Sequence, residues 1–107
     1  MTSYSRFLTA RIYFQSRKYR EAIVELKAVL ADEELPSLRG EALELLALAN
    51  FKAAYLPEAE RISREIIAAN PTDAYAHTIL VRSLERQSKR DEADSARRFA
   101  QAVGADV

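Results

Sequence analysis

The stretch "AANPTDAYAHTIL", residues 68–80, joins two runs of residues that both have the apolar spacing of helices. Pro71 ends the first run, because proline has no backbone N–H to donate and also restricts the residue before it. Asp73 is of a residue type that caps helices by accepting a hydrogen bond from a backbone N–H. The stretch therefore predicts a helix over 57–69 and a second helix over 73–87, joined by a very short turn.

One phrase recurs three times along the chain, as "YREAIVEL" (19–26), "LPEAERIS" (56–63) and "RDEADSAR" (90–97). Its alanines, Ala22, Ala59 and Ala93, lie 37 and 34 residues apart, which indicates a 34-residue repeat with three extra residues near "PSL". Such a unit has room for two helices of about a dozen residues and two short turns. We therefore expect a single domain whose repeats cover about 3–36, 40–73 and 74–107.

The composition favours helix throughout. The chain of 107 residues has two glycines and three prolines, and 49% of it is apolar, which suffices for a core at this size. No segment alternates apolar and polar residues for long enough to predict a strand. We predict an all-α fold, and the spacing of apolar residues places six helices at 4–16, 20–33, 37–53, 57–69, 73–87 and 91–103.

Charge and cysteine content exclude several classes of function. The 16 basic residues equal the 16 acidic ones, so the chain lacks the positive field that drives nucleic-acid binding, and RNA binding by helical repeats is disfavoured. Cysteine is absent, which excludes disulfides, thiolate nucleophiles and zinc fingers. The N-terminal segment has no long apolar core, so we expect neither a signal peptide nor a membrane anchor, and a cytoplasmic location.

Catalysis is not expected from this sequence. His77 is the single histidine, and its place on the inward side of the helix predicted over 73–87 favours a role in packing. The two glycines, Gly40 and Gly104, cannot build a glycine-rich phosphate loop, and no stretch resembles the turn that carries a catalytic nucleophile. We predict no metal site and no cofactor.

Residues 40–73, "GEALELLALANFKAAYLPEAERISREIIAANPTD", resemble a tetratricopeptide repeat, whose unit is an antiparallel helix pair of 34 residues. The matching positions are a small residue early in the first helix, a core leucine with a small neighbour, the alanine that opens the second helix and the closing proline: Ala42, Leu46, Ala47, Ala59 and Pro71. The units at 3–36 and 74–107 match less completely. Together the three units cover nearly the whole chain.

The chain departs from the family pattern at several positions. The small neighbour of the core leucine is Val81 in the third unit, and Ser63 and Arg97 stand where the second helix of a pair usually has a large residue. The glycine of the turn between paired helices is replaced in every unit, by Arg17, Ala54 and Ser88. A plain six-helix bundle is therefore the alternative to a repeat architecture.

The resemblance implies that three helix pairs stack into a right-handed superhelix, with the first helix of each pair lining a concave groove. In this family the ligand lies in that groove, so the resemblance implies an interaction module or adaptor that binds a peptide segment or a partner protein. The groove positions transferred by register are Tyr4, Phe7, Arg11, Phe14, Leu48, Phe51, Lys52, Tyr75, Arg82 and Arg86, together with Gln15, Glu41, Glu44, Thr78 and Glu85.

The residue types at these positions favour one kind of ligand. Aromatic residues and arginine anchor many interfaces, and Arg11, Arg82 and Arg86 together could grip a carboxylate of an extended peptide. We therefore expect a partner segment with acidic and apolar side chains. Two simpler interpretations stay open: Tyr4 and Phe7 cover the open end of the stack, and Arg82 and Arg86 pair with neighbouring acids on the surface.

The end of the chain suggests a second function. The helix predicted over 91–103 carries Ala96, Phe99 and Val103 on adjoining faces, and only "GADV" follows to cover them. Either Phe99 folds back over its own helix, or a second copy of the chain covers this candidate dimer patch. The alternative function is therefore a self-associating homodimer, in which the repeat surface builds the assembly.

Overall fold

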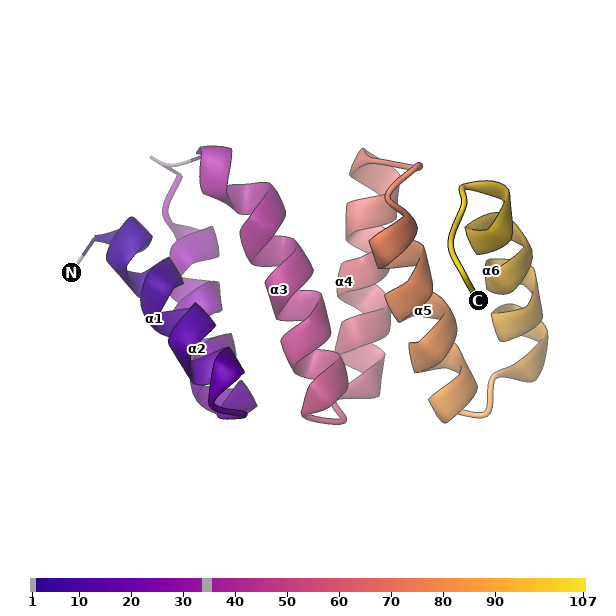
Figure 1. Ribbon diagram of the computed structural model, residues 1–107, viewed down its shortest axis with the longest axis horizontal. Helices are drawn as coiled ribbons and strands as arrows, with labels where there is room; N and C mark the ends of the chain where they lie inside the picture. Colours follow the sequence, from indigo (N-terminus) through magenta and orange to yellow (C-terminus); the bar gives the residue numbers. More distant parts are fainter. Residues whose placement is uncertain (1, 34–35) are drawn as a thin grey trace.

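The computed structural model describes residues 2–33 and 36–107, and these residues form six α-helices and one short 3-10 helix (Figure 1). The α-helices are Ser3–Gln15 (α1), Tyr19–Ala31 (α2), Arg39–Lys52 (α3), Leu56–Ala69 (α4), Ala74–Arg86 (α5) and Arg90–Ala102 (α6). None of the described residues belongs to a strand. The predicted all-α fold of six helices is confirmed, and each helix end lies within two residues of its expected position.

The helices follow one another along the long axis of the molecule (Figure 1). Each α-helix packs against the next one in the chain, and α3 also packs against α5. The molecule measures 43 Å along its longest axis and 24 and 19 Å along the others, because helix pairs are added side by side. Such an arrangement of adjacent paired helices is the helical-repeat architecture that the sequence predicts.

Small residues at equivalent places of the repeats let the helices approach closely. Ala22, Ala59 and Ala93 are all buried, with 0, 0 and 3% of their surface exposed. A second equivalent set is completely buried and consists of Ala10, Ala47 and Val81. Because two helices approach only as far as the side chains between them allow, these residues set the spacing of the stack.

The turns between paired helices share one backbone geometry. Among the described residues, positive φ angles occur outside glycine at Arg17, Ala54 and Ser88, with values of 62°, 64° and 61°. In each turn the next residue donates its N–H to a carbonyl five positions earlier: Lys18 to Tyr13 (2.8 Å), Tyr55 to Asn50 (2.8 Å) and Lys89 to Leu84 (3.0 Å). A left-handed residue with this hydrogen bond is the Schellman ending of a helix, which glycine usually supplies. The same ending therefore recurs at the spacing of the sequence repeat.

The three extra residues of the first repeat have a structure of their own. Pro36–Leu38 form the 3-10 helix η1, immediately before α3. Leu38 is the N-cap of α3 and makes no side-chain capping hydrogen bond. The insertion is therefore accommodated at the joint between α2 and α3 and not inside a helix.

Two side chains of the stretch that joins α4 and α5 hold this joint together. Asp73 caps α5 as predicted, because its carboxylate accepts the backbone N–H of Ala76 at 3.1 Å. The Nε2 atom of His77 donates to the carbonyl oxygen of Pro71 at 2.8 Å, which ties the first turn of α5 to the loop before it. His77 is 6% exposed, so its predicted inward packing is confirmed.

The last residues of the chain return over α6. Ala105 and Val107 pack against an apolar cluster that includes Ala100, and Gln101 donates a hydrogen bond from Nε2 to the carbonyl oxygen of Val107 at 2.9 Å. The expectation that nothing after α6 covers its apolar surface is therefore wrong for this side of the helix. Phe99 does not fold back, because 68% of its surface is exposed.

Candidate functional site

One helix of each pair contributes side chains to an open cavity of about 340 Å³, which we call the groove. The lining residues come from α1 (Phe7, Arg11, Phe14, Gln15), from α3 (Glu41, Glu44, Leu45, Leu48) and from α5 (Tyr75). Because α1, α3 and α5 are the first helices of their pairs, the groove lies on the helices that the repeat pattern assigns to a concave lining.

The apolar part of the groove is held in place by the core beneath it. Phe7 is 4% exposed, so it is a core residue that closes the bottom of the groove. The ring of Phe14 packs edge-on against Tyr19 of α2, with the ring centroids 5.2 Å apart. Leu45 and Leu48 are half-buried and pack against the main core cluster. A site whose walls are already fixed costs less entropy when a ligand binds.

Acidic side chains form the other part of the groove. A hydrogen bond with Asp73, partial burial, and the negative charges of Asp73 and Glu41 together raise the pKa of Glu44 from 4.5 to about 7. The carboxyl of Glu44 is therefore partly protonated near neutral pH. Burial, with the charges of Glu44 and Asp73, also raises the pKa of the Tyr75 hydroxyl, which stays protonated.

Half of the residues predicted for partner binding line the groove, namely Phe7, Arg11, Phe14, Leu48 and Tyr75. The structure does not bring Arg82 and Arg86 to the same cavity. Arg82 lies 3.0 Å from Glu85 in an ion pair, and the guanidinium carbon of Arg86 lies over the ring of Phe51, 5.2 Å from its centroid. Of these three arginines, Arg11 alone lines the groove. Tyr4 and Lys52 are exposed side chains outside the lining.

From the sequence, Asp73 was expected only to cap a helix, and Leu45 was not among the expected groove residues. Asp73 stands at the start of α5, where the cap of one helix pair meets the first helix of the preceding pair. Its carboxylate is close enough to Glu44 to raise the pKa of that group, at the edge of the groove where α3 packs against α5. The sequence signal for such a contact is an acidic residue at the N-cap of α5 together with an acidic residue on α3, the first helix of the preceding pair.

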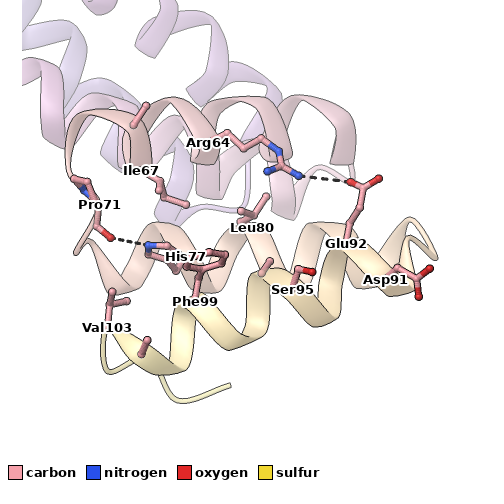
Figure 2. Close-up of a pocket in the computed structure, with 13 residues that line it drawn as sticks. Arg64, Ile67, Pro71, His77, Leu80, Asp91, Glu92, Ser95, Phe99 and Val103 are labelled. Atoms are coloured by element: carbon pink, nitrogen blue, oxygen red, sulfur yellow. Dashed lines mark hydrogen bonds and ion pairs between the residues drawn. The ribbon is translucent and has the colours of Figure 1, made fainter.

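The candidate dimer patch gathers in a second and larger cavity. Ala96, Phe99 and Val103 all line a space of about 720 Å³ between α4, α5 and α6 (Figure 2). Ala96 is 9% exposed and forms part of the wall, while Phe99 stands out from it. The predicted patch is therefore the side of a cavity and not a flat surface.

No protein-family model matches the sequence, and a search of curated proteins finds no match. The resemblance to tetratricopeptide repeats therefore depends on the residues of the repeat and on the paired helices. Throughout residues 2–33 and 36–107, no helix has the length and apolar character needed to cross a membrane. In the same ranges, no group of three or more His, Asp or Glu side chains could hold a metal ion.

Proposed function

We propose that the protein is an interaction module of the tetratricopeptide-repeat type, which binds an extended segment of a partner protein in the groove. The observation that carries this proposal is the convergence of side chains from α1, α3 and α5, one helix of each pair, on one open cavity. An apolar floor with a few polar groups around it is typical of a ligand site. Nothing in the groove has the arrangement of a nucleophile with its base, so binding is favoured over catalysis.

The groove favours a ligand segment that carries an apolar side chain beside a single acidic one. An apolar side chain that covers Phe14 and Leu48 removes their exposed surface from water, which favours binding. Arg11 is exposed and forms no ion pair within the described residues, so its guanidinium can bind a carboxylate with two parallel hydrogen bonds. Glu41 and Glu44 lie in the same cavity and repel further acids. The acidic group of the ligand is therefore expected only at Arg11.

An affinity experiment with groove variants tests the proposal. The chain is immobilised, retained proteins are identified by mass spectrometry, and the interacting segment is synthesised for titration by fluorescence anisotropy. We expect Arg11→Glu to weaken binding at least about tenfold, because it removes the cation and adds a further acid to the groove. Tyr75→Ala, at a residue that is 47% exposed, is expected to weaken binding through loss of apolar contact.

The matched control is Lys27→Glu, which makes the same change of charge at an exposed residue of α2, outside the groove. It should bind the segment as the unmodified chain does. Equal binding by the unmodified chain, Arg11→Glu and Tyr75→Ala would refute the groove as the binding site. An equal loss in Lys27→Glu and Arg11→Glu would show that overall charge, and not the groove, determines binding.

A further inference from the structure

The larger cavity lies between the second helices of two neighbouring pairs, α4 and α6, and α5 forms its floor (Figure 2). It shares no lining residue with the groove. Most of its wall is apolar and includes Ile67, Pro71, Leu80, Ala96, Phe99 and Val103. At one end, the guanidinium of Arg64 lies 3.5 Å from the carboxylate of Glu92.

Phe99 is an exposed aromatic side chain beside this cavity. Among the described residues, it has the largest exposed fraction of any large apolar side chain, 68%. Exposure of a whole aromatic ring to water is unfavourable, and the space next to it is large enough to take another ring. One copy of the chain therefore carries both a protruding side chain and a cavity that fits it, which is the requirement for a self-complementary interface.

The exposed stripe of α6 carries opposite charges at its two ends. Asp91 and Arg98 are seven residues apart, about two helical turns, so they lie on the same stripe with Ser95 between them. Both are exposed, and neither forms an ion pair within the described residues. Arg98 only donates a hydrogen bond to the hydroxyl of Ser95, at 3.2 Å.

We propose that two copies of this chain associate through antiparallel α6 helices, with Phe99 of each copy inserted into the cavity of the other. The twofold axis lies near Ser95. Asp91 of each copy then faces Arg98 of the other, so the same ion pair forms twice. The chain carries 16 acidic and 16 basic residues, so no net charge opposes the association of two copies.

The symmetry makes the two kinds of contact compatible. In an antiparallel twofold pair, each lateral edge of one helix meets the same edge of the other helix. By helical spacing, Phe99 lies about 80° around α6 from Asp91 and about 100° from Arg98, on one side of the stripe that these two residues define, and Asp91 and Ser95 also line the cavity. Side chains of a helix lean toward its N-terminus. Each Phe99 ring therefore reaches the turn of the second copy that contains Ser95, above Leu80.

The oligomeric state of the full chain tests the proposal. Sedimentation equilibrium over a wide range of concentrations is expected to show a reversible dimer with twice the mass of one chain. Phe99→Ala should raise the dissociation constant of this dimer at least about tenfold, while its circular dichroism stays unchanged because the side chain is exposed. The matched control is Ile12→Ala on α1, which is 62% exposed and should leave the dissociation constant unchanged.

A charge exchange tests the antiparallel arrangement itself. Arg98→Glu and Asp91→Arg should each weaken the dimer, because each variant places like charges opposite one another. A mixture of the two variants should form a heterodimer that is at least about tenfold tighter than either homodimer, since both ion pairs are then restored, one with its original polarity and one reversed. A nonspecific apolar contact would give no such preference.

Each of three results would overturn the proposal: a monomer at every concentration, a dimer whose dissociation constant is unchanged by Phe99→Ala, or a mixture of the two charge variants that shows no preference for the heterodimer. If Phe99→Ala instead abolishes capture of a different protein and the chain alone stays monomeric, the cavity serves that partner and the homodimer is refuted. None of these results depends on the groove, because the variants lie outside its lining.

Discussion

Replacement of Ala54 by glycine is expected to stabilise the protein. Ala54 has a φ of 64°, in the left-handed region, where the Cβ atom of an L-residue lies too close to a carbonyl oxygen. Glycine has no Cβ and adopts this conformation without strain. The hydrogen bond from Tyr55 to Asn50, at 2.8 Å, is part of the helix ending and holds Ala54 in place.

The magnitude follows from two opposing effects. A left-handed conformation costs a residue with a Cβ about 1–2 kcal/mol. Glycine makes the unfolded chain more flexible, which offsets about 0.4–1 kcal/mol of the gain. Ala54 is exposed, so loss of its methyl group removes no core contact. The net gain is therefore about 0.5–1 kcal/mol, which raises the melting temperature of a domain of this size by about 2–8 °C.

Thermal unfolding by circular dichroism and urea unfolding at constant pH measure this gain. The matched control is Ala53→Gly, one residue earlier, where φ is −80° and an alanine is unstrained. Ala53→Gly should lower the free energy of unfolding by about 0.5–1 kcal/mol, because glycine at this position only makes the unfolded chain more flexible and removes a side-chain contact. Arg17→Gly and Ser88→Gly should each resemble Ala54→Gly, and the three changes should add up to about 1.5–3 kcal/mol. If Ala54→Gly destabilises the chain as much as Ala53→Gly does, the strain at these turns does not exist.

Two further predictions concern Glu44 of the groove and its neighbour Asp73. The pKa of Glu44 is about 7 in the folded chain and 4.5 in the unfolded chain, so the folded state binds more protons between these values and its stability falls as pH rises through this window. This fall in the free energy of unfolding is on the order of 1 kcal/mol, because Glu44 is partly open to solvent, and Glu44→Gln should remove it. Urea unfolding at several pH values measures the free energy of unfolding of both chains. The same dependence on pH in both chains would contradict the raised pKa of Glu44. Asp73→Ala should cost about 1 kcal/mol at neutral pH through loss of the cap on Ala76, whereas Asp73→Asn, which can still cap, should cost less. Equal melting temperatures for Asp73→Ala and Asp73→Asn would show that the cap contributes little. Either variant should also weaken the pH dependence of stability that is due to Glu44.

The helices could be predicted because several local signals agree at each of them. Ala22, Ala59 and Ala93 recur at a fixed spacing, and a residue buried between packed helices has little freedom to be anything larger. Pro71 and Asp73 mark an end and a start through backbone chemistry that depends only on neighbouring residues. Such local rules do not need the tertiary structure, which explains why helix ends were predicted within two residues.

The site was predicted less completely, because it depends on choices between contacts. The register placed Arg82 and Arg86 on the lining helix, but a long side chain binds the strongest partner within reach. For Arg82 this is Glu85, one turn along the same helix, and for Arg86 it is the ring of Phe51 on α3. The return of Val107 over α6 was missed for a related reason: a short tail has no periodic pattern, and its position is set by the surface that it covers.

The two proposed surfaces can be tested separately because they diverge from a single shared helix. Tyr75 of α5 lines the groove, whereas His77, two residues later, lines the cavity beside α6. α5 is packed on both sides, so substitutions at its buried residues would disturb both surfaces together and could not tell them apart. Arg11 and Phe99 lie on exposed positions of the first and last helices, far apart in the stack, so their effects should be independent. A chain with both Arg11→Glu and Phe99→Ala should therefore lose binding to the partner segment by the same factor as Arg11→Glu alone, and a departure from that factor would show that α5 couples the two surfaces.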